Sequence, residues 1–96
     1  MNYKDKITEI TITPIKPNDG LVGFVSFTYD QTFYLGSIGI YTRIEGGYRL
    51  TYPLRKNTMK NINYFYPINK DIQLALEEVV TEKYEELMSF GDIKYE

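Results

Sequence analysis

The side chains best suited to chemistry in this chain are the basic and aromatic residues of its middle third. No Asp or Glu occurs between Glu45 and Asp71, while the same stretch contains Arg49, Arg55, Lys56, Lys60 and Lys70. Neighbouring Lys and Arg side chains on exposed backbone contact phosphates, and tyrosines interleaved with them can stack on bases. The pattern suggests an anionic partner such as a nucleic acid. Composition alone, however, favours the alternative, a solvated loop that is basic for solubility.

The chain contains no histidine and no cysteine, which removes most catalytic and metal chemistry. Disulfides, Cys/His zinc sites, thiol nucleophiles and Ser-His-Asp triads all require one of these residues. The glutamates between residues 77 and 86 could form a carboxylate pair. We expect them to line a solvent-exposed helix face, where nothing would shift a pKa. The sequence therefore predicts a protein that is not an enzyme and uses no cofactor or metal.

The length and composition predict a single domain spanning residues 1–96. The chain has 96 residues, is 43% hydrophobic and carries a net charge of −2. A domain this small has a thin core, so association through an exposed sheet edge would help it. No apolar run approaches the roughly 18 residues of a membrane span, and the first residues do not resemble a signal peptide. We expect a cytoplasmic protein without a membrane partner.

The first two thirds of the chain has the composition of an antiparallel sheet, with β-branched and aromatic runs separated by turns. Asn18-Asp19-Gly20 and Glu45-Gly46-Gly47 are the clearest turn signals, because these residues tolerate a positive φ. Pro14 is expected to end the first strand, and residues 54–62 to form a polar, basic loop. The expected strands are residues 7–13, 21–29, 33–43 and 48–52, with a candidate fifth strand at 63–66.

Helical spacing of apolar residues begins after Asn69, which is a suitable N-cap, and Asp71 is favourably placed in the first turn. We expect Gly91 to stop the helix and residues 89–96 to form a mobile tail. The predicted fold class is α+β: an antiparallel β-sheet of about four to five strands followed by one amphipathic C-terminal α-helix. The expected apolar face of the helix comprises Ile72, Leu76, Val79, Val80, Tyr84 and Leu87.

Most aromatic side chains of the strands are expected to pack against this helix rather than to bind bases. Tyr64 and Tyr66, next to the basic loop, are the aromatic residues that we propose for base stacking. Arg43 and Arg49 could face outward beside the loop, and the alternative for both is cross-strand pairing with Glu9 or Glu45. The aromatic residues assigned to core packing are Phe24, Phe27, Phe33, Tyr48 and Tyr52.

The order of these motifs resembles the SpoVG family, the stage V sporulation or septation protein G of bacteria. The resemblance covers about residues 6–87. The matching segments, in order, are Ile7-Thr8-Glu9-Ile10, Asn18-Asp19-Gly20, Phe24-Val25-Ser26-Phe27-Thr28-Tyr29-Asp30, Ile38 to Ile40, Glu45-Gly46, Pro53-Leu54-Arg55-Lys56, Pro67-Ile68-Asn69 and the helix that ends near Glu86.

The resemblance implies a sheet-plus-helix domain that dimerises by edge-strand pairing, binds DNA and RNA, and influences septation, sporulation and gene expression. It places much of the nucleic-acid contact in the basic loop, which corresponds here to residues 55–58 and to Lys60. This chain differs from the family where its loop is one residue shorter, where Tyr66 replaces a histidine and where Gly39 replaces an arginine. The resemblance therefore implies the fold more strongly than the affinity.

These observations predict a small DNA- or RNA-binding regulator that forms a homodimer and needs no small-molecule substrate. The alternative is a protein-interaction module that acts on a cell-division or transcription partner without binding nucleic acid. Arg55 and Lys56 would contact phosphates, while Asn57 and Thr58 could donate hydrogen bonds to a phosphate or a base edge. The candidate nucleic-acid-binding residues are Arg49, Arg55, Lys56, Asn57, Thr58, Lys60 and Tyr66.

Overall fold

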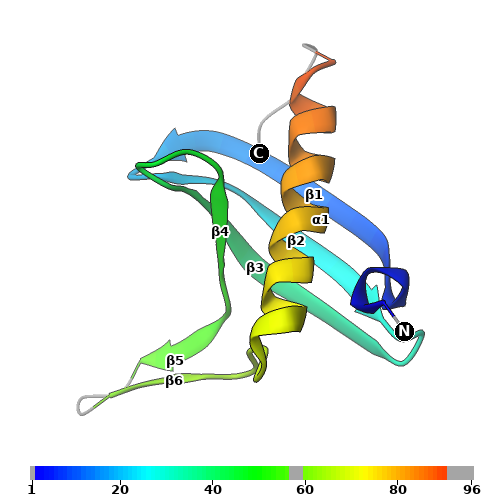
Figure 1. Ribbon diagram of the computed structural model, residues 1–96. Helices are drawn as coiled ribbons and strands as arrows, with labels where there is room; N and C mark the ends of the chain where they lie inside the picture. The colour runs from blue at the N-terminus through cyan, green and yellow to red at the C-terminus, as the bar shows by residue number, and fades with distance from the viewer. Residues whose placement is uncertain (1, 57–59, 91–96) are drawn as a thin grey trace.

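The computed structural model describes residues 2–56 and 60–90, which form a four-stranded antiparallel sheet crossed by one helix (Figure 1). Strands β1 to β4 are adjacent in chain order, so each pairs with the next through a hairpin. The predicted α+β class is confirmed. The elements are a 3-10 turn η1 (Tyr3–Lys6), β1 (Ile7–Asn18), β2 (Leu21–Tyr29), β3 (Phe33–Thr42), β4 (Tyr48–Thr51), β5 (Leu54–Lys56), β6 (Asn61–Asn63) and α1 (Lys70–Met88).

The hairpin turns form where the sequence predicts them. Asp19 and Gly20 adopt φ values of 52° and 90° between β1 and β2, as a two-residue hairpin turn requires. Gly46 and Gly47 also have positive φ values at the β3–β4 turn. The Arg43 amide there donates to the Gly47 carbonyl at 3.0 Å. The turn residues thus determine where the chain reverses direction between strands.

Strand β1 is longer than predicted, because it continues through Pro14 to Asn18. Pro14 lies opposite Gly23 of β2 and is buried. Proline is tolerated there because β1 is an edge strand, whose outer side has no partner strand to receive an amide hydrogen bond. The prediction that Pro14 ends the strand was therefore wrong.

A β-bulge near the start of β1 sets which of its side chains face the helix. Thr8 pairs with Thr28 and Thr11 with Ser26, so β1 holds one residue more than β2 in this interval. Glu9 occupies the bulge with a φ of 52°. The extra residue reverses the side-chain alternation, so Ile10 joins Ile7 at the core despite their odd spacing.

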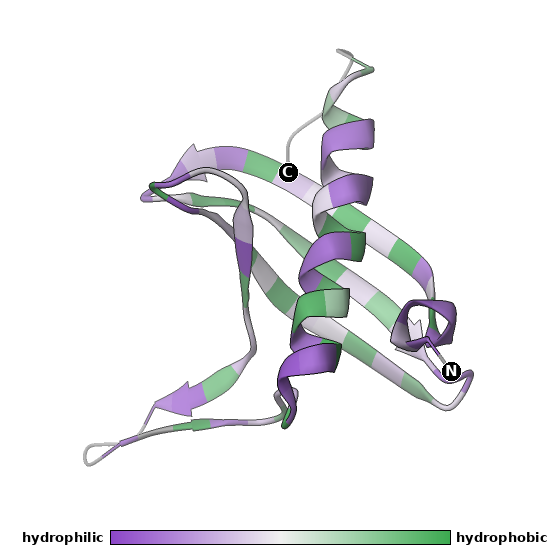
Figure 2. Cartoon of the chain, in the orientation of Figure 1, coloured by the Kyte–Doolittle hydropathy of each residue, from purple (hydrophilic) through white to green (hydrophobic). Residues whose placement is uncertain are grey.

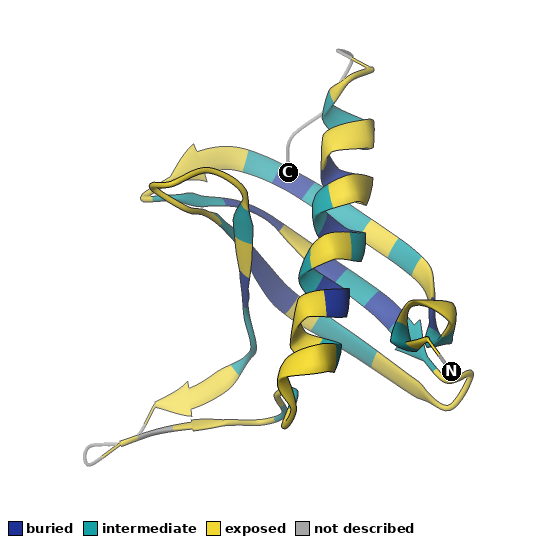
Figure 3. Cartoon of the chain, in the orientation of Figure 1, coloured by how far each residue is buried: buried dark blue, intermediate teal, exposed yellow. Residues whose placement is uncertain are grey.

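Helix α1 covers one face of the sheet and has the predicted first residue. Asn69 caps it by accepting a hydrogen bond from the Ile72 amide at 2.8 Å. Hydrophobic and hydrophilic segments alternate along the helix (Figure 2), and buried segments alternate with exposed ones where it crosses the sheet (Figure 3). The helix ends at Met88 with Ser89 as its C-cap, and the predicted stop at Gly91 lies outside the described residues.

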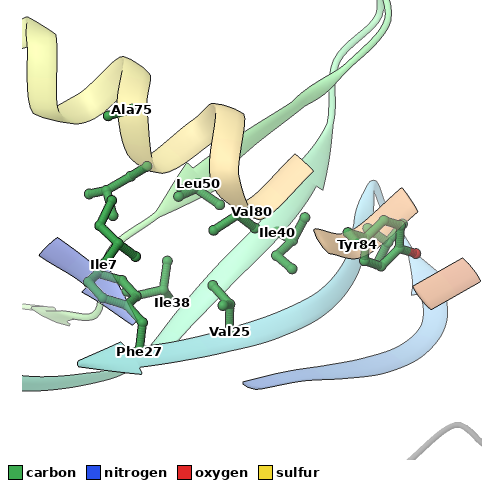
Figure 4. Close-up of a cluster of buried hydrophobic side chains, with 11 residues drawn as sticks. Ile7, Val25, Phe27, Ile38, Ile40, Leu50, Ala75, Val80 and Tyr84 are labelled. Carbon is green, nitrogen blue, oxygen red and sulfur yellow. The ribbon is translucent and has the colours of Figure 1, made fainter. Parts of the chain in front are cut away.

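The core lies between this helix and the sheet (Figure 4). Ala75, which the predicted apolar face omits, is buried among the larger side chains of the strands. Burial of this surface supplies the main stabilisation of the domain. The buried hydrophobic residues are Ile7, Val22, Val25, Phe27, Ile38, Ile40, Leu50, Ala75, Leu76, Val80 and Tyr84.

Two of the aromatic residues assigned to core packing are exposed instead. Phe27 is buried, and Tyr48 and Tyr52 pack against the core as predicted. Phe24 is 40% exposed because it lies on the sheet face opposite the helix, while Phe33 is 62% exposed beside the β2–β3 turn. These two predictions were wrong because a single helix covers only one face of the sheet, which leaves Phe24 exposed on the other face. The helix also does not cover the end of the sheet at the β2–β3 turn, where Phe33 lies.

Candidate functional site

The predicted basic loop is in part a two-stranded antiparallel ribbon, β5–β6, separate from the main sheet. Arg55 pairs with Ile62, and Lys56 pairs with Asn61. The strand expected at residues 63–66 lies instead at Asn61–Asn63, because its pairing partner is β5. Figure 1 shows the ribbon extending away from α1 and from the body of the main sheet. Candidates Asn57 and Thr58 lie outside the described residues.

Arg55 and Lys56 are exposed on opposite faces of the ribbon. Successive side chains of a strand point to opposite faces, so Arg55 shares a face with Ile62, while Lys56 shares the other with Leu54. Lys60, just before β6, is also exposed. None of these three cations forms an ion pair with another described residue. The ribbon therefore presents positive charge in two directions.

Hydrogen bonds and a ring contact join the two segments through which the chain enters and leaves the ribbon. The Tyr64 amide donates to the Pro53 carbonyl at 2.8 Å, and the Asn63 side-chain amide donates to the Tyr52 carbonyl at 3.0 Å. The rings of Tyr52 and Phe65 meet edge-to-face with centroids 6.1 Å apart. These contacts close the base of the ribbon.

The structure places Arg49 on the open face of the main sheet rather than on the ribbon. Its neighbour Leu50 is buried under the helix, so Arg49 points the other way. Its guanidinium carbon lies 4.8 Å from the centroid of the Tyr41 ring, a cation–π contact. Such a contact holds the guanidinium on an exposed sheet surface.

Arg43 has a structural partner that the sequence did not predict. Its guanidinium lies 3.0 Å from Glu77 of α1, and its Nε donates to the Tyr48 carbonyl at 3.2 Å. Glu9, one of the proposed partners, instead accepts a hydrogen bond from Thr28. The proposed cross-strand pairing of Arg43 was wrong, because the helix crosses the sheet close to the β3–β4 turn.

The helix glutamates are less uniformly exposed than predicted. The Glu77 side chain is 15% exposed and pairs with Arg43, while Glu78 pairs with Lys4 of η1. The hydrogen bond to Glu78 raises the pKa of Lys4 above its usual value, and the charge of Glu78 adds to the effect. Two of the glutamates thus attach the helix to the rest of the domain.

The predicted stacking residues Tyr64 and Tyr66 are both exposed, 68% and 60% respectively, where the chain leaves the ribbon.

A second aromatic surface was missed by the sequence reasoning. On the open sheet face, Phe24 and Tyr34 line a shallow groove together with hydroxyl side chains of β1, β2 and β3. The alternation of side chains along β2 places Phe24 and Val25 on opposite faces of the sheet. This alternation was the signal that could have identified the second aromatic surface.

Within residues 2–56 and 60–90, no group of acidic side chains is arranged to hold a metal ion. In the same part of the chain, no helix combines the length and the apolar character needed to cross a membrane.

Comparison with known proteins identifies the family. The family model SpoVG matches residues 5–86. A protein of Onion yellows phytoplasma named "Putative septation protein SpoVG" is 30% identical over 86 residues, which cover 86% of this chain and 84% of the relative. A protein of the same name from Caldicellulosiruptor saccharolyticus is 30% identical over 90 residues, covering 91% and 99% of the two chains. With a sheet, helix and basic segment in the expected order, the chain belongs to the SpoVG family.

Proposed function

We propose that the protein is a nucleic-acid-binding regulator that contacts phosphates through the β5–β6 ribbon. The observation that carries the proposal is the placement of Arg55 and Lys56 on opposite faces of an exposed ribbon that contains no acidic residue. The major groove of B-DNA admits a two-stranded β-ribbon. A ribbon that stands edge-on in that groove turns one face toward each phosphate backbone. Cations on opposite faces of the ribbon can then contact both phosphate backbones, whereas two cations on one face can contact only one of them.

The other candidate residues extend this surface. Lys60 adds a third exposed cation to the ribbon, and Asn57 and Thr58 would supply neutral hydrogen-bond donors between the two strands. Tyr66 offers an exposed ring at the base of the ribbon for an unpaired base. Arg49 would contact a phosphate on the open sheet face rather than join the ribbon. Its distinct position makes it a secondary contact.

A homodimer formed by strand pairing is part of the proposal. β4 pairs only with Gly39–Thr42, so Phe33–Ile38 has no described strand partner on that side. The opposite edge, β1, carries Pro14 and Pro17, which cannot donate to a neighbouring strand. Pairing through the first half of β3 would bring two ribbons into one particle. We propose that this dimer acts in the cytoplasm in gene regulation, septation and sporulation.

The test is a fluorescence-anisotropy titration of duplex DNA and single-stranded RNA, from low to physiological salt. Log affinity should fall linearly with log salt, with a slope near −0.9 per phosphate contact on duplex DNA. The double variant Arg55→Ala, Lys56→Ala should make that slope shallower by about 2, at unchanged melting temperature. The control is Lys16→Ala with Lys83→Ala, which removes the same charge from exposed positions on β1 and α1.

Equal binding by the ribbon and control variants would remove the ribbon from the proposal. Absence of binding at low salt would favour the second candidate, a protein-interaction module. The observation that favours this candidate is the exposure of Leu54 and Ile62 on the ribbon, at 38% and 42%. Exposed apolar side chains of this kind suit a protein partner in septation or transcription.

A further inference from the structure

The face of the main sheet opposite α1 carries aromatic side chains on its two central strands. Phe24 lies on β2, and Tyr34 and Tyr41 lie on β3; the strand order places β2 and β3 in the middle of the sheet. A chain neighbour of each residue packs in the core, so the three rings point to the open face. Phe24 and Tyr34 are exposed, and Tyr41 is half-buried. Together, these three residues form an aromatic platform.

Two glycines of β3 allow the tyrosine rings of the platform to lie close to the sheet. A Cβ at Gly36 would lie 3.3 Å from Cε2 and 3.4 Å from the hydroxyl oxygen of Tyr34. A Cβ at Gly39 would lie 3.3 Å from Cε2 of Tyr41 and 2.6 Å from Oγ1 of Thr51. Tyr34 therefore leans forward along β3 and Tyr41 leans backward. The two rings converge on the middle of the strand, where Gly39 pairs with Phe24.

Hydroxyl side chains surround the rings in the shallow groove beside Phe24 and Tyr34. The described residues that line this groove include no charged side chain. Each hydroxyl group can donate one hydrogen bond and accept others. A planar group stacked on a ring would therefore meet donors and acceptors along its edge. The four groove hydroxyls belong to Thr11, Thr13, Ser26 and Ser37.

Arg49 supplies a positive charge at one end of the platform. It pairs with Tyr41 across β3 and β4, and its guanidinium carbon lies 4.8 Å from the centroid of that ring. The carboxylate of Glu9 lies near the other end, where it accepts a hydrogen bond from Thr28, the residue that pairs with Tyr34. A phosphate on this face would therefore be drawn to the Arg49 end.

We propose that the open face of the main sheet binds single-stranded RNA. Unpaired bases would stack on the aromatic platform, and Arg49 would contact a phosphate of the same strand. Four-stranded sheets with aromatic side chains on one open face stack unpaired RNA bases in this way. The groove hydroxyls would form hydrogen bonds with base edges and with the ribose 2′-hydroxyls, which DNA lacks.

The platform goes beyond the proposed ribbon contacts and does not depend on them. The ribbon would contact phosphates, which a duplex and a single strand both present. The platform requires free base faces, and the bases of a duplex are already stacked on one another. A duplex and an unpaired strand would therefore use separate surfaces of the protein.

The experiment titrates the full chain into a short fluorescent single-stranded RNA and follows its anisotropy. The same RNA backbone without bases, and single-stranded DNA of the same sequence, should both bind more weakly. Phe24→Leu removes a ring but keeps an apolar side chain, and it should weaken RNA binding about ten-fold, the loss expected for one stacking contact. Phe24→Trp, which keeps a ring, should bind like the wild type. The matched control Phe90→Leu removes an exposed ring beyond the end of α1 and should leave the affinity unchanged.

Two further measurements separate the platform from the ribbon and from misfolding. Phe24→Leu should bind duplex DNA as the wild type does, while Arg55→Ala with Lys56→Ala should still prefer the RNA with bases over the backbone without them. Amide chemical shifts of the wild type should change on β2 and β3 when the RNA is added. This mapping needs no variant, so it tests the platform even if Phe24→Leu does not fold.

Several outcomes would overturn the proposal. These are absence of RNA binding, equal affinity for the backbone without bases, chemical shift changes confined to other elements, or equal losses in Phe24→Leu and Phe90→Leu. Equal affinity for RNA and DNA would overturn the contact between the groove hydroxyls and ribose. Failure of the ribbon variant to weaken duplex binding would count against the ribbon and not against the platform.

Discussion

Arg55 and Lys56 are adjacent in the chain, but strand geometry directs their side chains to opposite faces of the ribbon. The other exposed arginines differ from them in having partners: Arg43 is paired with Glu77, and Arg49 lies over the Tyr41 ring. At the scale of single residues, the proposed binding surface therefore combines cations that form no ion pair with a described residue and a position on the ribbon. Charge alone does not distinguish them.

Tyr52 should make the stability of the domain sensitive to alkaline pH. Burial raises its pKa in the folded protein to about 12, against an ordinary value of 10. The unfolded chain therefore releases this proton first, and the free energy of unfolding should fall as pH rises from about 10 toward 12. Below pH 10 the contribution should be fully present.

Chemical denaturation of the wild type and Tyr52→Phe at pH 8, 10 and 11.5 checks this prediction. The variant should lose less stability than the wild type between the two higher pH values. Tyr48→Phe serves as a comparison: burial also raises the pKa of Tyr48, so this variant too should lose less stability than the wild type. Parallel pH profiles for the wild type and Tyr52→Phe would contradict the assignment.

At the scale of elements, the best-predicted feature is the helix, because its signals are local. Its N-cap, its apolar spacing and its first residue all follow from the side chains of residues 69–88. The ribbon is the opposite case. Leu54–Lys56 and Asn61–Asn63 become strands only by pairing with each other, so a short polar sequence resembled a loop.

Removal of the helix cap should destabilise the domain without changing its fold. Asn69→Ala deletes the acceptor of the Ile72 amide hydrogen bond, which should cost about 1 kcal/mol. For a domain of this size, the melting temperature should fall by about 4–8 °C. Asn69→Asp, which retains an acceptor, should melt close to the wild type in the same calorimetric scan. An unchanged melting temperature in Asn69→Ala would mean that the cap contributes nothing.

At the scale of the whole molecule, the two sheet edges differ. β1 is blunted by two prolines, whereas the first half of β3 offers unpaired backbone and exposed aromatic side chains. Tyr34, in that half, is 74% exposed. Edge strands without protection pair readily with other strands. The asymmetry favours the first half of β3 over β1 as the dimer interface.

The variant Tyr34→Lys should increase the monomer fraction, since strand pairing would bring two like charges together. Light scattering after size-exclusion chromatography over a dilution series measures this fraction. Thr11→Lys is the matched control, because it adds the same charge to an exposed position on the β1 edge. A monomeric wild type, or equal dissociation of both variants, would rule out the β3 edge.

The sequence by itself determined the order of β1 to β4 and the helix, the positions of the hairpin turns, the first residue of the helix and the basic character of residues 46–70. These features depend on local preferences and on spacing along the chain. The tertiary structure decided which cations are paired, which sheet face stays open, and that the basic segment forms a ribbon. Each of these depends on contacts between residues distant in the chain, such as Arg43 with Glu77 and Tyr52 with Phe65, which no local pattern encodes.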